Sequence, residues 1–466
     1  MLNLFNKIHQ LLSEISLCES CLGRQFAQLL TGTTNRKRGE ALLISLGLEL
    51  HFDIINLNKT LPDYESLLHL PFPIIKQSYE KIALVAEVQS LSDNPLENKP
   101  AKKLDILPES KICYICQGLF EKSRLNELAD LVCSHAKHYE FFTFLVGSKI
   151  PSSMIEREEN IRTKYNLTFG ESIKSDLNRE IGKLIYLQPA FNEKDLDFNI
   201  PDIVFIVNMV DNLIDIQNNP IFIYGKYNKL QRGIPQTVWY CNECWGKGCD
   251  KCDYSGRKHP DAVEEYILPE IIQACKAKEG KFHGSGREDV DALMLGEGRP
   301  FVAQIQEPKI RTLDLKQLEE EINNKSNERV KITLIEMTNR EKVRNIKIKS
   351  PSMRKHYRMG VILPSPQKID FSLLNKLVGS IKQQTPKRVL HRRADLTRTR
   401  EVFKMTGNQV DDKRIEVEII CSGGLYVKEL IHGDDGRTKP SLSQVLGDIS
   451  LIVEYLDVLK VEDLKK

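Results

Sequence analysis

Hydrophobic residues recur every three to four positions along several stretches of the first half of the chain, the spacing of amphipathic helices. Near the start, Leu4, Ile8, Leu11 and Ile15 follow this spacing and predict a helix over residues 3–17. The same spacing predicts helices over residues 123–138, 155–164 and 173–185. Short apolar runs predict strands over residues 141–146, 203–210 and 221–224. Helices that alternate with strands in this way indicate a small α/β module.

The second half of the chain contains more short apolar runs. They predict strands over residues 301–305, 330–336 and 343–348. Helical spacing predicts helices over residues 262–278, interrupted by Pro269, and over residues 313–323. This order of elements fits an α+β domain built on an antiparallel sheet with a central cleft.

Length and charge narrow the class of protein. A chain of 466 residues has room for two or three domains, each with its own core. The 67 basic and 64 acidic residues nearly cancel to +3, so a nucleic-acid surface would have to come from local clusters. No apolar run approaches the roughly 20 residues of a membrane span, and the N-terminus lacks a signal-peptide pattern. We expect a cytoplasmic protein that does not bind membranes.

Eight of the eleven cysteines fall into four Cys-x-x-Cys pairs, a spacing typical of metal ligands. The predicted ligands of a first structural zinc are Cys18, Cys21, Cys113 and Cys116. The predicted ligands of a second zinc are Cys241, Cys244, Cys249 and Cys252, with glycines that permit a tight reversal between the two pairs. Unrelated pairs of reduced thiols remain the alternative interpretation.

The segment FHGSGREDVDALMLGEGR, residues 282–299, combines four glycines with four acidic residues and two arginines. A carboxylate near an arginine on such a loop can be held ionised in a cleft and act as a nucleophile. Asp289 and Asp291 lie two positions apart, and we expect them to face opposite sides of the loop, with Asp291 bonded to the glycine-rich turn. A solvated acidic turn would account for the same pattern.

A second segment with candidate chemistry is strongly basic. Residues 387–404 contain seven lysines and arginines against two acidic residues. Because charges of alternating sign are largely absent, a phosphate-binding element accounts for this segment better than a solvated helix face does.

The run GREDVDALMLGEGRPF resembles the active-site motif of the archaeal and eukaryotic tRNA pseudouridine synthases of the Pus-ten family, which implies that Asp289 is the catalytic aspartate. The run TPKRV shortly before HRR is similar to the same family. CSGGLYVKELIHGDDGRT resembles a segment of bacterial tRNA pseudouridine-55 synthases, which implies that Lys428 pairs with the aspartate. In the segment RKHY, the resemblance implies that Tyr357 stacks on the flipped base.

The resemblance also implies a division of the chain. Residues 1–240 would form an accessory zinc- and RNA-binding region that resembles a THUMP domain and ends near FIYGKYNKLQRGIPQT. Residues 241–260 would form the second zinc knuckle and a linker, and residues 261–466 the catalytic domain with the antiparallel sheet of pseudouridine synthases. The predicted RNA contacts are Lys226, Lys229, Arg232, Arg287, Arg354, Lys387, Arg388, Arg392, Arg393, Arg398 and Arg400.

The implied activity is isomerisation of uridine 55, and of uridine 54 as a second target, in the T-arm of tRNA. It requires one aspartate nucleophile and no organic cofactor, and we expect a monomer whose partner is tRNA. One alternative is a zinc-containing tRNA-binding protein without catalysis. Another is a different THUMP-bearing tRNA-modifying enzyme, although a methylase would need a glycine-rich cofactor loop after a strand, and the sequence contains none.

Overall fold

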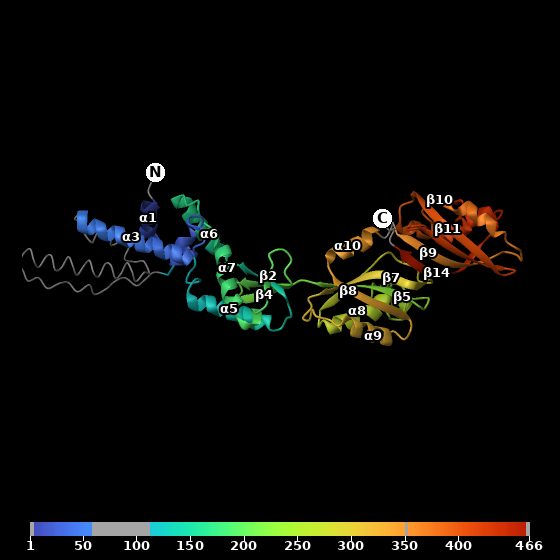
Figure 1. Ribbon diagram of the computed structural model, residues 1–466, viewed down its shortest axis with the longest axis horizontal. Helices are drawn as coiled ribbons and strands as arrows, with labels where there is room; N and C mark the ends of the chain where they lie inside the picture. Colours follow the sequence, from blue (N-terminus) through green and yellow to red (C-terminus); the bar gives the residue numbers. More distant parts are fainter. Residues whose placement is uncertain (1–3, 58–111, 350–352, 463–466) are drawn as a thin grey trace, which may run out of the picture. The chain divides into compact units, whose positions relative to one another are not determined.

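The chain folds into two compact units, Met1–Gln217 and Asn218–Lys466. The computed structural model describes residues 4–57, 112–349 and 353–462, and Figure 1 shows these elements in chain order. Each unit has its own sheet and its own hydrophobic core. Among the described residues, no helix has the length and apolar character needed to cross a membrane.

The first unit is a small α/β module. Its four-stranded sheet has the order β2-β1-β3-β4, and β1 runs parallel to both of its neighbours. The strands are β1 (Thr143–Lys149), β2 (Asp195–Leu196), β3 (Ile203–Asn208) and β4 (Leu213–Asn218). The helices are α1 (Leu4–Glu14), α2 (Glu19–Arg24), α3 (Asn35–Leu57), α5 (Lys122–Ala136), α6 (Ser152–Tyr165) and α7 (Ile173–Tyr186).

Burial explains why the helices of this unit form where the sequence predicts them. In α1, Ile8, Leu11 and Leu12 are fully buried, and they lie on one face at helical spacing. The centre of the core is aromatic, and the rings of Phe144 and Phe191 are 4.7 Å apart in an edge-on arrangement. The predicted helices and the strands at β1 and β3 are therefore confirmed.

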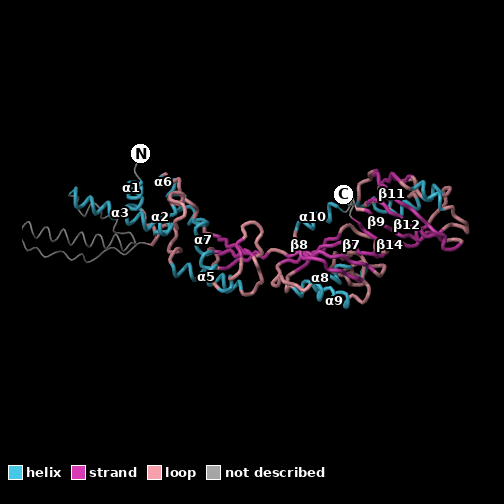
Figure 2. Tube along the Cα trace, in the orientation of Figure 1, coloured by secondary structure: helices cyan, strands magenta, loops and turns pink. Residues whose placement is uncertain are grey.

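The second unit is built on a ten-stranded sheet, which the strand colouring of Figure 2 shows running through the unit. The strand order is β13-β10-β11-β12-β9-β14-β7-β5-β8, with β6 paired to β7. All pairs are antiparallel except β14 with β7. The strands are β5 (Ile221–Lys229), β6 (Glu279–Gly284), β7 (Leu293–Gln306), β8 (Val330–Thr338), β9 (Arg354–Ile362), β10 (Gly379–Gln384), β11 (Thr397–Asp411), β12 (Arg414–Ser422), β13 (Thr438–Lys439) and β14 (Ile452–Glu462).

Helices cover both faces of the part of this sheet that contains β5, β7 and β8 (Figure 1). Ile223 and Phe301 face a core shared with α8 (Val263–Ala274) and α9 (Leu315–Lys325). Their sequence neighbours Phe222 and Val302 face α10 (Arg340–Lys349) on the other side, as the alternation of side chains along a strand requires. The other half of the sheet packs on α11 (Val427–His432), α12 (Leu442–Val445) and η5 (Phe371–Leu377).

Three features differ from the sequence prediction. The strand predicted over residues 343–348 is wrong, because this segment is part of α10, where Val343 and Ile346 bury one face at helical spacing. The helix predicted over residues 262–278 is not interrupted, because α8 continues through Pro269. The compact units divide after Gln217, so β5 lies in the sheet of the second unit and not at the end of the THUMP-like region.

Candidate active site

The loop between β6 and β7, residues 285–292, carries the acidic motif, and we call it the Asp289 loop. Backbone pairing holds both of its ends, since Gly284 of β6 pairs with Phe301 of β7, and Leu293 of β7 pairs with Asp457 of β14. Within the loop, Gly286 has a φ of +75°, a conformation that favours glycine. The loop therefore enters and leaves the sheet at fixed positions.

The inner side of the Asp289 loop is a buried network of charges. The Glu288 carboxylate accepts from Arg299 Nε at 2.7 Å and from the Tyr227 hydroxyl at 2.9 Å, and the Glu288 and Arg299 side chains are 1% exposed. Arg299 also donates to the Ser285 carbonyl at 3.0 Å. Because a buried charge is costly without a partner, these bonds fix Glu288 on the inner side. The sequence did not predict Glu288, Arg299 or Tyr227 as members of the site.

Lys229 belongs to the same inner network, which corrects its prediction as an RNA contact. Its side chain is fully buried, and its ammonium donates to the carbonyls of Ile234, Asp289 and Val290 at 2.8, 3.0 and 3.0 Å. Burial lowers the pKa of Lys229 to about 8. With all three donors used inside the protein, Lys229 supports the backbone of the loop and offers nothing to a phosphate.

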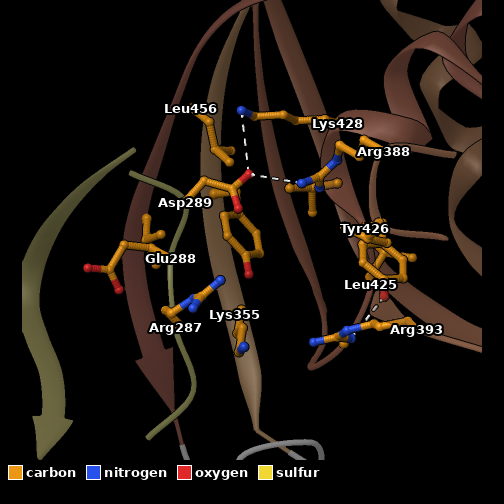
Figure 3. A pocket seen from close by; sticks show the side chains of 15 residues that line it. Arg287, Glu288, Asp289, Lys355, Arg388, Arg393, Leu425, Tyr426, Lys428 and Leu456 are labelled. Carbon is orange, nitrogen blue, oxygen red and sulfur yellow. Dashed lines mark hydrogen bonds and ion pairs between the residues drawn. The ribbon is translucent and has the colours of Figure 1, made fainter. Parts of the chain in front are cut away.

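The pocket side of the loop carries the predicted catalytic pair. The Asp289 carboxylate lies 3.5 Å from Lys428 Nζ and 3.7 Å from Arg388 Nη1, and Figure 3 shows the three side chains converging. Lys428 extends from α11 and Arg388 from η6 (Lys387–Arg392). Arg388 in turn donates to the buried carboxylate of Glu429 at 2.6 Å. The structure thus brings Lys428 to Asp289 and adds Arg388, which the sequence predicted only as an RNA contact.

Asp291 does not face away from Asp289, so that expectation is wrong. Its carboxylate lies 2.8 Å from Lys428 Nζ, closer than that of Asp289. Burial raises the pKa of Asp291, but the hydrogen bond and charge of Lys428 outweigh this effect and lower the pKa overall. Residues 289–292 form a turn that is closed by a hydrogen bond from Ala292 N to the Asp289 carbonyl at 3.1 Å, and in this turn both carboxylates reach one lysine. Asp291 is 66% exposed and does not line the pocket.

The pocket above Asp289 has a volume of about 510 Å³ and combines cations with an apolar wall. It is lined by Arg287, Glu288, Asp289, Lys355, Tyr357, Arg388, Val389, Arg393, Gly424, Leu425, Tyr426, Val427, Lys428, Leu456 and Val458. Tyr357 stands on β9 between Ile419 of β12 and Val458 of β14, and burial raises its pKa. Its ring is therefore neutral and available to the pocket. Tyr426 and Lys355 also line the pocket, and the sequence did not predict either.

Several predicted RNA contacts lie outside the pocket. Lys226 pairs with Glu297 at 3.2 Å and Lys387 with Asp435 at 2.6 Å. Four other predicted RNA contacts are also engaged within the protein. Arg232 pairs with Asp457 at 2.5 Å, and the Arg354 guanidinium lies 4.6 Å from the centroid of the Phe403 ring. Arg398 donates to the Thr385 hydroxyl at 3.0 Å, and Arg400 donates to the Thr399 carbonyl at 2.9 Å. The side chain of Arg392 is outside the described residues. The structure places only Arg287, Arg388 and Arg393 of the predicted RNA contacts on the described pocket wall.

The two cysteine clusters form as the spacing predicts, and each could hold a metal ion. In each cluster the four sulfurs lie within 4.8 Å of one another. Cys18 and Cys116 are 3.7 Å apart, and Cys241 and Cys249 are 3.8 Å apart. Four sulfurs at about 2.3 Å from a tetrahedral zinc would be about 3.8 Å from one another, so the donors fit this ion. In the first cluster, Arg24 also donates to the sulfur of Cys21 at 3.4 Å.

Comparison with known proteins gives a consistent family match. A family model described as "Pus10, C-terminal" matches residues 222–462, and one described as "Pus10 THUMP domain, archaeal" matches residues 128–208. The tRNA pseudouridine synthase Pus10 of Methanocaldococcus jannaschii is 41% identical over 98% of this chain and 94% of its own length. That of Methanothrix thermoacetophila is 36% identical over 96% of this chain and 91% of its own length. One solved structure, a Cbf5-Nop10-Gar1 complex, aligns with 42% of this chain and 44% of its own at 14% identity and a TM-score of 0.26, a likeness too low to support an argument.

Proposed function

Because this chain belongs to the Pus10 family of tRNA pseudouridine synthases, we propose that it isomerises uridine 55 of the tRNA T-arm, with uridine 54 as a second target, through Asp289. One observation carries the assignment of the nucleophile. Of the two neighbouring carboxylates on the pocket wall, Glu288 is bonded to Arg299 and Tyr227 on the inner side, whereas Asp289 is 37% exposed and faces two cations.

The reaction requires groups that this pocket contains. The bond between ribose C1′ and uracil N1 breaks, a bond between C1′ and C5 forms, C5 loses its proton and N1 gains one. Asp289 supplies the nucleophile that attacks the ribose or the base. Lys428 and Arg388 stabilise its negative charge, and Tyr357 offers a ring on which the flipped base stacks. The buried side chains of Leu456 and Val458 provide an apolar wall that excludes water from the reacting atoms.

We propose that the RNA backbone follows the basic residues around the pocket mouth. Arg287 and Arg393 line the pocket. Lys387, Arg398 and Arg400 belong, like Arg393, to the basic segment 387–404, and Arg398 and Arg400 lie on β11. Further candidate contacts are Lys226, Arg232, Arg354 and Arg392. Surface cations of this kind attract phosphates without reading the base sequence.

Mapping of pseudouridine in unmodified tRNA transcripts tests the proposed activity. The purified protein should convert uridine 55, and the same transcript with cytidine at position 55 should show whether uridine 54 is converted independently. Asp289→Asn protein on the same transcripts should yield none. If the wild-type protein binds these transcripts and no tRNA gains a pseudouridine, the chain is an RNA-binding protein without this chemistry.

We propose that both cysteine clusters hold structural zinc. In each cluster all four positions of the ion would be filled by cysteines, which leaves none for substrate. Bound zinc would tie α2 to the Cys113–Cys116 segment and would contribute folding free energy to the first unit. Metal analysis should find two zincs per chain, and Cys18→Ser should lower thermal stability while the modification rate at permissive temperature is retained. Metal-free protein of undiminished stability would contradict this proposal.

A further inference from the structure

The cations of the pocket fall into two groups (Figure 3). At one end, Lys428 and Arg388 have carboxylate partners, since Lys428 is paired with Asp289 and Asp291, and Arg388 with Asp289 and Glu429. At the other end are the side chains of Arg287, Lys355 and Arg393. Carboxylates of the protein itself therefore neutralise the first group.

The cations at the second end have no carboxylate partner among the residues that the structure describes. Arg287 lies over the ring of Trp239, 5.1 Å from its centroid, and Arg393 donates to the Tyr426 hydroxyl at 3.0 Å. The side-chain ammonium of Lys355 makes no hydrogen bond or ion pair within the described ranges 4–57, 112–349 and 353–462. Glu288 lines the same pocket, but Arg299 and Tyr227 already hold its carboxylate. Three cations therefore face one region of the pocket, and none of them is paired with a carboxylate of the described residues.

Lys355 is the most informative of the three, because it is also buried. Only 8% of the residue is exposed, and it stands on β9 between Cys421 of β12 and Val461 of β14. Burial, together with the nearby Arg299 guanidinium, lowers the pKa of Lys355 to about 8, although Cys421 and Glu288 act in the opposite direction. A buried cation is normally paired, and replacement of buried charged groups by apolar side chains of similar volume is often neutral or stabilising. A lysine that weakens the free protein in this way is expected to gain its partner from a ligand.

We infer that Arg287, Lys355 and Arg393 form an anion subsite that binds a phosphate of the RNA backbone beside the target uridine, with Lys355 as its innermost contact. The base and ribose of a uridine carry no charge at neutral pH, so the phosphodiester is the one anion that the substrate brings to this pocket. The identity of the ligand as RNA rests on the proposed function. The subsite fixes the nucleotide at the end of the pocket opposite Lys428, so that Asp289 meets the reacting atoms from the other end.

A charge-deletion experiment tests the contact directly. The full-length Asp289→Asn protein, which cannot turn over, is titrated with T-arm stem-loops in which one phosphate at a time near the target uridine is an uncharged methylphosphonate. At one position the replacement should weaken binding about tenfold, because a hydrogen bond between charged groups is lost. When Lys355→Gln is added, the same replacement should cost less than about twofold. Equal losses with and without Lys355 at every position would show that no phosphate contacts this lysine.

Stability separates a ligand contact from a structural role. Lys355→Met retains length and apolar character but removes the unpaired charge, so its melting temperature should equal or exceed that of the parent protein while RNA affinity falls. A lower melting temperature together with lower affinity would show that Lys355 supports the fold and would overturn the subsite. Lys316→Gln, at an exposed position of α9, is the matched control and should change neither quantity. Pseudouridine formation by the wild-type protein on the same stem-loops reports separately on the proposed function.

Discussion

The inner side and the pocket side of the Asp289 loop contain similar groups in opposite situations. On the inner side, Glu288 and Arg299 are 1% exposed and bonded at 2.7 Å. On the pocket side, Asp289 is 37% exposed and lies 3.5 Å from Lys428. Closely bonded, buried charges hold a structure in one conformation, whereas a carboxylate with longer contacts and access to solvent is free to react. The difference teaches that neighbouring acids in one motif can occupy opposite environments, one buried in a network of bonds and one open to a pocket.

The largest expected effect is on the pocket side. Asp289→Asn should reduce pseudouridine formation on the order of 10⁴-fold or more, because the nucleophile is lost at nearly constant shape. Its melting temperature and tRNA affinity should stay close to those of the parent protein. Rates are measured on a T-arm transcript under single-turnover conditions.

Asp291→Asn is the matched control for this change, since Asp291 bonds to the same Lys428 but does not line the pocket. It should retain measurable turnover. If Asp291→Asn abolishes activity and Asp289→Asn retains it, the nucleophile has been assigned to the wrong carboxylate.

The next largest effect comes from the inner side of the Asp289 loop and is a loss in the free energy of unfolding. Glu288→Gln leaves Arg299 and Lys229 as buried cations without their anion, at a cost of about 3 to 5 kcal/mol in the free energy of unfolding. Glu297→Gln, whose carboxylate is 60% exposed, should cost less than about 1 kcal/mol. Urea unfolding measures both changes. A Glu288→Gln protein as stable as the control would remove the distinction between the two sides of the loop.

Tyr357 both lines the pocket and packs against the hydrophobic core, so its substitution tests whether the ring contacts RNA or stabilises the fold. Tyr357→Ala should lose about 1 to 3 kcal/mol of base stacking and slow turnover accordingly. Tyr357→Phe keeps the ring and should retain most RNA affinity. Should Tyr357→Ala unfold more easily but turn over at the normal rate when folded, the ring serves the core and does not contact the base.

A smaller effect is the change of RNA affinity with pH that results from the titration of Lys355. Its pKa is lowered to about 8, so it is protonated below that pH and loses its charge above it. RNA affinity of the Asp289→Asn protein should therefore fall between pH 7 and 9, by up to about tenfold. The protein that also carries Lys355→Gln should show a smaller fall, and fluorescence anisotropy at constant ionic strength measures both.

The effect of pH on stability has the opposite sign to its effect on RNA affinity. Because the pKa of Lys355 in the folded protein lies below its ordinary value of 10.5, the unfolded chain binds more protons between pH 8 and 10. The protein with Lys355 should therefore become more stable relative to Lys355→Met as pH rises through this window. A constant difference would indicate that the lysine is already neutral or already paired.

The smallest expected effect concerns Arg393 at the pocket rim. Arg393→Ala should reduce the slope of log affinity against log salt by about 0.7 to 0.9 if it neutralises one phosphate. Lys316→Gln should leave the slope unchanged. An unchanged slope for Arg393→Ala would place the RNA backbone elsewhere on the protein.

The sequence determined the parts of the protein that depend on local pattern. Helical spacing located α1 and α5, and the Cys-x-x-Cys spacing located the four pairs of sulfurs that form the two cysteine clusters, because a short turn sets the donors within each pair. Resemblance in the acidic motif predicted Asp289 as the catalytic aspartate, and the structure places Lys428 beside it as the second motif implies. The segment that forms α10 was mistaken for a strand, since a short apolar run fits both periods until its packing partners are known.

The tertiary structure decided which charges face inward. Glu288, Asp289 and Asp291 lie within four residues, yet contacts with segments distant in sequence decide which carboxylate is buried and which faces the pocket. Tyr227 of β5 and Arg299 of β7 draw Glu288 into the interior, and the same sheet buries Lys229, which the sequence alone presents as one more surface lysine. Lys355 was missed for the same reason, because the burial of a charge and the absence of its partner depend on neighbouring strands and not on adjacent residues.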